Sequence, residues 1–273
     1  MSEKTIQNSV SQEHKKYLKS KKLENLAVKA TQTGILIFWI FAWEISARLG
    51  WIDSFILSSP SRICKTLVSL SSAHQLWNNI GVTAWETVVG FLLGTIIGIA
   101  FAVIIWLSDF IFKVTDPYLV VLNALPKVAL GPVIIVWMGA GTKSIIIMAL
   151  LVSVIIATLN VLAGFKSVSA EKILLMKSFG ANKFQILTKL IIPANIPTII
   201  STLKINVGMS LIGVITGEFL VASKGIGYLI VYGGQVFKLD LVMTGIFILS
   251  IIASLMYFIV SKAEAFYLSN RQK

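Results

Sequence analysis

Long apolar runs alternate with short polar segments along most of the chain. Each run is close to the roughly 20 residues that cross a hydrocarbon core about 30 Å thick. The runs cover approximately residues 31–50, 78–107, 116–138, 145–165, 196–220 and 241–260. The pattern therefore predicts an all-α polytopic membrane protein with six transmembrane helices.

The connecting segments carry their own local signals. An amphipathic piece at residues 61–70 predicts an interfacial helix in an external loop. Residues 108–117 predict a short internal loop, because Asp116 can cap a helix and Pro117 suits its first turn. Residues 222–240 are rich in glycine and predict an external segment with a short apolar insert.

The third apolar run contains two prolines, Pro126 and Pro132. Proline removes a backbone hydrogen-bond donor, and irregular backbone at membrane depth is tolerated only against protein or a cavity. Asn123, Pro126 and Lys127 are therefore candidates for lining a translocation pathway. The alternative is that Lys127 lies near the membrane interface and extends its ammonium group into the headgroups.

Other polar side chains lie inside apolar runs, where they are expensive in lipid and should face protein or water. Glu86 lies in the second run, and Asn206 and Glu218 lie in the fifth. These three complete the set of candidate pathway residues. In the first run, Glu44 and Arg48 are four residues apart and predict a structural pair on one helix face.

Small residues recur every fourth position in the second run, at Gly90, Gly94, Gly98 and Ala102. Such a stripe lets a neighbouring transmembrane helix approach closely. We therefore expect Gly90, Gly94 and Gly98 to form a helix-packing face.

Composition agrees with a membrane protein, since 56% of the 273 residues are hydrophobic and 13% are charged. A soluble domain carries about a quarter charged residues. The single cysteine, Cys64, excludes an internal disulfide. The sequence shows no metal-ligand spacing, no Cys/His pair and no Gly-x-Ser-x-Gly motif. We therefore expect no catalytic residue and no metal site in this chain.

The basic charge follows the predicted topology. With the N-terminus inside, 16 lysines and arginines fall in inner segments and 5 in outer segments, a strong positive-inside bias. The outer ones are Arg62, Lys65, Lys143, Lys224 and Lys238. This bias places both termini in the cytoplasm and makes a nucleic-acid partner unnecessary to explain the net charge of +12.

A charged amphipathic stretch, SAEKILLMKSFGANKFQILTKLIIP (residues 169–193), separates the fourth and fifth runs. Ser169 can cap a helix whose first turn holds Glu171, and Gly180 suits its end. Pro193 predicts a break before the fifth span. A short helix with exposed apolar side chains in the cytoplasm fits a groove on a partner; the alternative is a helix lying on the inner headgroups.

The same stretch resembles the cytoplasmic signature of the inner-membrane permeases of ATP-binding-cassette (ABC) importers. That signature reads Glu-Ala-Ala, three residues, Gly, nine residues, Ile, one residue, Leu-Pro. Gly180 takes the place of the glycine, and Leu190-Ile191-Ile192-Pro193 is similar to the end of the signature. Leu174-Leu175-Met176 stands where the signature has Glu-Ala-Ala, which is a departure from the family pattern.

Further blocks resemble the nitrate, sulfonate and taurine branch of these permeases, over approximately residues 77–260. The blocks are Asp116-Pro117, Asn123-Ala124-Leu125-Pro126-Lys127, Ile135-Val136-Trp137-Met138-Gly139, Phe179-Gly180-Ala181, Gly217-Glu218-Phe219 and Gly225-Ile226-Gly227-Tyr228-Leu229-Ile230.

The resemblance implies a type I importer half in the plasma (inner) membrane of a prokaryote. Two copies of the permease, as a homodimer, would form the pathway, two cytoplasmic ABC ATPases would each receive a coupling helix, and an extracytoplasmic binding protein would deliver the substrate. ATP and Mg²⁺ would be bound by the ATPase and no cofactor by this chain. The implied coupling residues are Ser169, Glu171, Leu174, Leu175, Met176, Lys177, Phe179, Gly180, Ala181 and Pro193.

The resemblance also implies a domain division. Residues 1–30 would be a cytoplasmic basic tail, 31–76 the first transmembrane helix with its external loop, 77–262 the type I transmembrane domain, and 263–273 a cytoplasmic C-terminal tail.

The substrate class is implied only by the resemblance to the nitrate, sulfonate and taurine branch. That branch transports small anions such as sulfonates, taurine, nitrate and bicarbonate, and its relatives transport the pyrimidine precursor of thiamine or riboflavin. Lys127 would suit an anion, whereas Glu86 and Glu218 would not. The alternative function is a secondary transporter, which should show matching broken helices in two halves; the breaks occur only in the third run.

Overall fold

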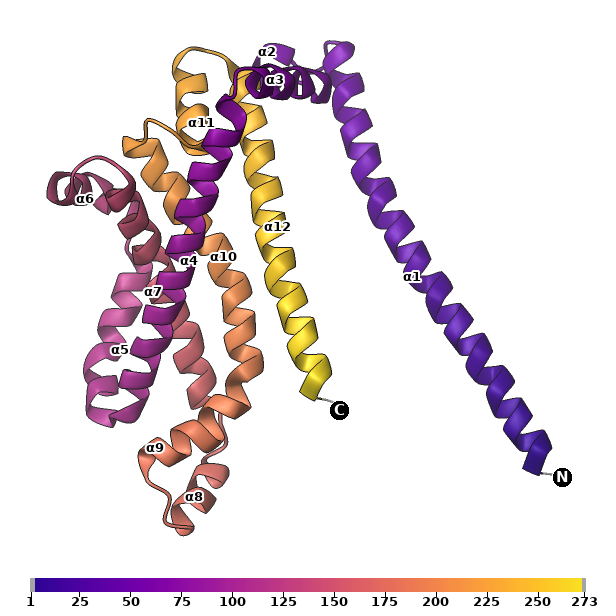
Figure 1. The fold of residues 1–273 in the computed structure, drawn as a ribbon, viewed down its shortest axis with the longest axis vertical. Coiled ribbons are helices and arrows are strands. Elements are labelled where there is room, and N and C mark those ends of the chain that lie inside the picture. The colour runs from indigo at the N-terminus through magenta and orange to yellow at the C-terminus, as the bar shows by residue number, and fades with distance from the viewer. Residues whose placement is uncertain (1–2, 272–273) are drawn as a thin grey trace. The chain divides into compact units, whose positions relative to one another are not determined.

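The protein is helical over most of residues 3–271, the residues that this computed structural model describes (Figure 1). Side chains are described for residue 14 and residues 16–265, and no strand occurs in residues 3–271. The elements are α1 (Glu3–Arg48), α2 (Ser54–Leu57), α3 (Pro60–Ser72), α4 (Gln75–Leu107), α5 (Asp109–Ala124), η1 (Lys127–Leu130), α6 (Gly131–Met138), α7 (Thr142–Lys166), α8 (Ala170–Ser178), α9 (Lys183–Ile186), η2 (Leu187–Ile191), α10 (Ile192–Val221), α11 (Ile226–Gln235) and α12 (Leu239–Arg271).

Five helical segments in the described part of the chain are long and apolar enough to cross a membrane. They are Lys16–Arg48, Gln75–Leu107, Thr142–Lys166, Lys183–Val221 and Leu239–Ala265. A sixth span results if the bent pair of α5 with η1 and α6 is counted as one broken span. The predicted all-α membrane fold is therefore confirmed with five or six candidate spans.

The chain forms two compact units, Met1–Lys65 and Thr66–Lys273. In the first unit, α1 continues through most of the predicted tail at residues 1–30, so the described part of that tail is helical. Residues 3–33 contain no glycine or proline and are rich in Lys, Leu, Glu, Gln and Ala, which favour helices. Residues 1–2 of that predicted tail lie outside the described residues.

The end of α1 is tied to the start of α3 by one carboxylate. Glu44 accepts a 2.7 Å hydrogen bond from Arg48 Nε and a 3.0 Å hydrogen bond from the backbone N–H of Ser61. The guanidinium of Arg62 donates to the carbonyl of Ser54 at 2.8 Å. The predicted Glu44–Arg48 pair and the predicted helix at residues 61–70 are both confirmed.

In the second unit, the segment predicted as a short internal loop is helical instead. Residues 108–117 belong mostly to α5, whose N-cap is Ser108, and its hydroxyl accepts from the N–H of Ile111 at 3.3 Å. Pro117 lies inside this helix rather than in its first turn, so the expected loop and the helix start at Asp116 are wrong. Ser108 offers a capping side chain one turn or more earlier, and the helix continues from there.

A bend of 90° separates α5 from η1 and α6. Leu125 and Pro126 form the break, and both have extended backbone angles. Pro132 lies in the first turn of α6, where its missing N–H removes no intrahelical bond. Pro126 therefore lies at a break in the helix, as predicted, whereas Pro132 begins a new helix.

The membrane bundle is built around α7, which packs against α4 and α10 (Figure 1). A Cβ placed on Gly90 would lie 2.7 Å from the Cβ of Ala149, and one on Gly98 would lie 2.5 Å from the Cβ of Ala157. Gly94 faces Ser153 in the same manner. Larger side chains on this stripe of α4 would push the two helices apart.

The bundle has an apolar core at each end. At one end, side chains of α4, α7, α9 and η2 pack together, including the fully buried Phe165 and Ile191. At the other end, α11 and α12 pack against α10, with Ile226 and Leu229 buried. An ion pair between Lys204 and Glu264 joins α10 to α12.

The C-terminal helix is longer than predicted. The sixth span was expected at residues 241–260, followed by a tail at 263–273. Instead α12 continues as helix to Arg271, and residues 272–273 of the tail lie outside the described residues.

Candidate functional site

Helix α8 lies outside the candidate spans, at the end of the bundle opposite α11 (Figure 1). Its inner side holds Ile173 and Met176, which are partly buried against the core formed by α4, α7, α9 and η2. Leu174, Leu175 and Phe179 lie on its outer side and are 66%, 57% and 80% exposed. We call these three side chains the outer face of α8.

Helix α8 begins where the sequence predicts, but the predicted capping hydrogen bond is not formed within the described part of the chain. Ser169 occupies the N-cap position, yet its hydroxyl makes no capping hydrogen bond among the described residues. Glu171 lies in the first turn and Lys177 in the last turn, each with the sign that favours its end of the helix. Both side chains are exposed.

The end of α8 is a Schellman motif. The N–H of Ala181 donates to the carbonyl of Met176 at 3.0 Å, and the N–H of Gly180 donates to the carbonyl of Lys177 at 2.9 Å. Gly180 has a φ of +76°, a left-handed conformation that glycine adopts without steric cost. The predicted helix stop at Gly180 is therefore confirmed.

A capping box follows at once and was missed from the sequence. The side chain of Asn182 accepts from the N–H of Gln185 at 2.8 Å, and the side chain of Gln185 accepts from the N–H of Asn182 at 2.8 Å. The spacing of a capping residue and a Gln three positions later is a sequence signal for this motif. The two motifs fix the turn between α8 and α9.

The predicted break at Pro193 does not occur. The segment from Lys183 to Val221 is one continuous helical span, in which the π-helical turn η2 precedes α10. Pro193 lies in the first turn of α10, and the N–H of Ile192 donates to the carbonyl of Leu187 five residues earlier. A π-helical turn changes the hydrogen-bonding register, so a proline can follow without ending the helix.

A second group of polar residues lies at the opposite end of the bundle, beneath the start of α11. The N–H of Gly225 donates to Asn79 Oδ1 at 2.7 Å, and the N–H of Ile226 donates to Thr83 Oγ1 at 2.8 Å. The N–H of Gly227 donates to Glu218 Oε2 at 2.5 Å. Side chains of α4 and α10 thus satisfy the free N–H groups at the start of α11.

Two of these three side chains are also linked to each other. The hydroxyl of Thr83 donates to Glu218 Oε1 at 2.6 Å, and the side chain of Glu218 is buried, with 1% exposed. We call Asn79, Thr83 and Glu218 the α11 anchor. Asn79 and Thr83 were missed from the sequence, although their spacing with Glu86 places three polar residues on one face of an apolar helix.

Glu86 adjoins this anchor. Its carboxyl group is buried, with 1% exposed, and lies beside the carboxyl of Glu218 and the hydroxyl of Thr142. Its Oε2 atom has no hydrogen-bond partner among the described residues. The structure therefore brings two of the predicted pathway residues, Glu86 and Glu218, together inside a single chain.

Asn206 lies apart from that pair, twelve residues before Glu218 and thus about 18 Å away along α10. Its Nδ2 atom donates to Thr95 Oγ1 at 2.7 Å, which links α10 to α4. Its Oδ1 atom and the hydroxyl of Ser210 have no hydrogen-bond partner among the described residues.

The remaining predicted pathway residues gather at the bend after α5. The ammonium group of Lys127 donates to the backbone carbonyl of Asn123 at 2.7 Å, at the end of α5. Asn123 and Pro126 are exposed and Lys127 is half-buried on the single chain. Among the six candidates, contacts in the structure thus join Glu86 to Glu218 and Lys127 to Asn123.

Comparisons with known proteins agree on one class. A family model described as binding-protein-dependent transport system inner membrane component matches residues 90–268. A probable ABC transporter permease protein of Haemophilus influenzae is 31% identical over 219 residues, which are 80% of this chain and 89% of that protein. The taurine transport system permease protein TauC of Escherichia coli is 25% identical and covers 82% of this chain and 83% of its own.

A third relative, the formylaminopyrimidine transport permease protein ThiX of Halalkalibacterium halodurans, is 29% identical over 85% of this chain and 92% of its own. Among solved structures, an inward-facing MetNI methionine ABC transporter chain superposes with a TM-score of 0.63 at 16% identity, over 71% of this chain and 96% of that chain. A bacterial transporter that imports alginate gives 0.62 at 15% identity, over 88% and 95%. These likenesses show the fold.

Proposed function

Because the chain belongs to the family of binding-protein-dependent transport system inner membrane components, the non-catalytic permeases of ABC importers, we propose that it forms the pathway for a small anionic or polar nutrient. Membership confirms the resemblance read from the sequence. It also favours ATP-driven uptake over the secondary transporter that the sequence left open. Hydrolysis of ATP belongs to a separate subunit.

The outer face of α8 is the observation that supports coupling to that subunit. Three large apolar side chains are exposed at the end of the bundle, and burying one such side chain stabilises a complex by about 1.5–3 kcal/mol. The Schellman motif and the capping box hold α8 in one orientation. We infer that residues 169–181 form the coupling helix, docked in a groove of the ATPase.

The composition of this face supports an apolar groove on the partner. Leu174 and Leu175 stand where the family signature has a glutamate and an alanine. Ser169 and Glu171 would lie at the rim of the contact. Met176, Ala181 and Pro193 would support it from the bundle side, on which Lys177 also lies.

The proposed assembly contains two permease copies, two ATPases and an extracytoplasmic binding protein. Asn123 and Pro126 are exposed on the single chain, so a pathway that they line would be completed by a second copy. We propose that ATP and Mg²⁺ are bound by the ATPases. The positive-inside bias supports cytoplasmic termini.

Substrate class is proposed from the relatives. They are described as permeases for taurine, aliphatic sulfonates, nitrate, formylaminopyrimidine and riboflavin. We propose that Lys127, beside the broken backbone, attracts a small anion. Glu86, Asn206 and Glu218 are buried in the single chain, so their part would be to couple pathway helices rather than to line an open channel.

The proposal is tested by replacing Leu174, Leu175 and Phe179 together with serine. The permease is co-expressed with its cognate ABC ATPase and purified from membranes. Loss of at least tenfold of the co-purified ATPase is expected, because the docking face is removed while the core stays intact.

The matched control is Phe237→Ser, which removes a side chain that is 73% exposed at the α11 end. It should leave the co-purified ATPase unchanged. Normal recovery of ATPase with the triple variant would contradict the docking role of α8.

A further inference from the structure

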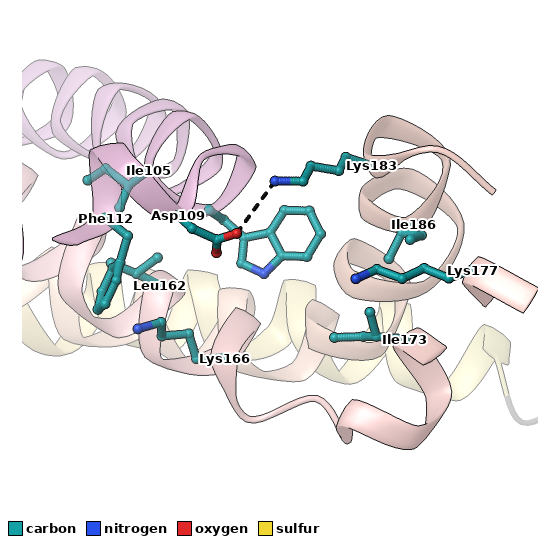
Figure 2. A pocket seen from close by; sticks show the side chains of 10 residues that line it. Ile105, Asp109, Phe112, Leu162, Lys166, Ile173, Lys177, Lys183 and Ile186 are labelled. Atoms are coloured by element: carbon teal, nitrogen blue, oxygen red, sulfur yellow. Dashed lines mark ion pairs between the residues drawn. The ribbon is translucent and has the colours of Figure 1, made fainter. Parts of the chain in front are cut away.

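A cavity of about 190 Å³ lies between α8 and the end of the membrane bundle, behind the outer face of α8 (Figure 2). It is lined by residues from α4, α5, α7, α8 and α9. At about 30 Å³ for each water molecule, it has room for several waters and hence for a phosphate group.

Three lysines and one aspartate stand around this cavity. They are Lys166, Lys177, Lys183 and Asp109. Figure 2 shows Lys177 and Lys183 reaching from α8 and α9 toward the side on which Asp109 and Lys166 lie. With formal charges of three positive and one negative, the lining has a net charge of +2, which favours an anion.

The single carboxylate does not neutralise this group. Lys183 Nζ lies 3.6 Å from Asp109 Oδ2, and this pair is exposed, so it contributes little and can open. Lys166 lies over the ring of Phe112, with its Nζ 2.8 Å from the ring centroid. Lys177 has no hydrogen bond or ion pair with any described residue. The ammonium groups of Lys166 and Lys177 therefore have no anionic partner among the residues whose side chains are described.

The floor of the cavity is apolar, in contrast to its rim. Ile105, Leu162 and Ile186 line it and are buried in the adjacent core. Trp106 also lines it, at the last turn of α4, and tryptophan is enriched at the membrane interface. A basic rim above an apolar floor is the arrangement that binds phospholipid headgroups between transmembrane helices.

The depth of the cavity agrees with such a ligand. Two candidate spans end at its lining, α4 at Leu107 and α7 at Lys166, and α5 begins beside them at Asp109. Helix ends mark the border between hydrocarbon and water. In a bilayer crossed by these candidate spans, the cavity would lie at the level of the headgroups of one leaflet.

We propose that this cavity is a binding site for a phosphate group, held by Lys166, Lys177 and Lys183. The group would come from an anionic phospholipid or from a soluble phosphate. Because Lys177 belongs to α8 and Lys166 to α7, a bound phosphate would link α8 to the bundle and steady the helix on its inner side. The inference needs only that the bundle spans a bilayer, so it stands apart from the identity of the partner at the outer face.

The test measures the thermal stability of the purified full chain in detergent micelles at fixed ionic strength. Dioleoylphosphatidylglycerol, dioleoylphosphatidylcholine and sodium phosphate are added in separate arms, and lipid adducts are counted by native mass spectrometry. The pocket variant carries Lys166→Gln, Lys177→Gln and Lys183→Gln. The control variant carries Lys113→Gln, Lys172→Gln and Lys189→Gln, which removes the same charge from lysines that do not line the cavity.

Phosphatidylglycerol should raise the Tm of the unmodified chain and of the control variant, and phosphatidylcholine should not. The pocket variant should need at least tenfold more phosphatidylglycerol for the same rise. An equal rise with sodium phosphate alone supports the site and assigns it to a soluble phosphate; no rise with phosphate assigns it to the lipid.

Equal responses of the pocket and control variants would overturn the proposal, and so would the absence of any response to both anions. Lys177→Gln serves as a second variant, because Lys177 is exposed and its replacement removes no internal bond. It alone should weaken the response several-fold, and an unchanged response would also count against the site.

Discussion

The two ends of the bundle are unusual in opposite ways: one exposes large apolar side chains, and the other buries polar ones. At the α8 end, Leu174, Leu175 and Phe179 are apolar and exposed. At the α11 end, Thr83 and Glu218 are polar and buried, yet they are hydrogen-bonded to each other and to the backbone of α11. The first arrangement leaves an interaction unmade, and the second completes every bond of the anchor within the chain.

This difference indicates which end has a fixed geometry and which end can bind a partner. A buried polar network that is fully satisfied fixes one geometry, because each broken bond leaves an unpaired group in a medium of low dielectric constant. An exposed apolar face gains free energy only when a partner covers it. The α11 end is therefore suited to hold helices together, and the α8 end is suited to bind a partner.

The largest effect on stability is expected from Glu218→Ala. It removes the acceptor of the Thr83 hydroxyl and the Gly227 N–H, and each orphaned buried group costs about 1–3 kcal/mol. The total loss should be about 2–6 kcal/mol for the two groups together, measured as a fall in Tm of the purified chain. Glu218→Gln keeps one acceptor and should lose about half as much.

The serine triple variant of the outer face should leave Tm nearly unchanged in the same assay. Equal losses in the two variants would break the comparison, because they would show that the outer face of α8 is already packed within the chain.

The sequence was sufficient for five of the six predicted spans and for one end of α8. Apolar run lengths gave the helices, and Gly180 marked the end of α8 because a left-handed residue is needed there. The helix start predicted at Asp116 and Pro117 was wrong, because the helix begins at an earlier capping residue and contains Pro117 in its interior. Pro193 misled because a π-helical turn absorbs the change of register.

The α11 anchor could not be read from the sequence. Thr83 and Glu218 are 135 positions apart, and their pairing depends on how α4 and α10 pack. The sequence showed only that each polar residue in an apolar run needs a partner. It placed Glu86, Asn206, Lys127 and Glu218 in one candidate group. In the fold, Glu86 and Glu218 lie side by side, whereas Asn206 lies about 18 Å from Glu218 along α10.

A smaller effect is expected from Ile173→Ser, which changes the inner side of α8. Ile173 is half-buried against the bundle core, and its loss should cost about 1–2 kcal/mol. Hydrogen exchange of the backbone of α8 should become faster, while exchange in α11 stays the same. Unchanged exchange in α8 would show that its inner side does not hold it on the bundle.

Gly180→Ala should cost about 1–2 kcal/mol, because an L side chain is strained in the left-handed conformation. A Cβ there would meet no described atom within 4 Å, so strain rather than a clash is responsible. The expected result is weaker stimulation of the ATPase by the reconstituted permease. Gly180→Asn is the control and should retain more activity, since Asn tolerates this conformation.

The smallest effect on stability is expected from Lys127→Ala, at about 1 kcal/mol or less for one hydrogen bond to the end of α5. Substrate uptake by the reconstituted transporter should fall several-fold while the ATPase remains bound. Unchanged uptake would remove Lys127 from the pathway and leave it as a cap of α5.

The most direct measurement concerns the outer face of α8 itself. The single cysteine is replaced by Cys64→Ser, and Phe179→Cys or Phe237→Cys then provides one thiol at either end of the bundle. Labelling by a bulky maleimide is followed with and without the bound ATPase. Docking predicts that the ATPase slows labelling at position 179 at least tenfold and leaves position 237 unchanged. Equal labelling at position 179 with and without the ATPase would contradict the coupling role of α8.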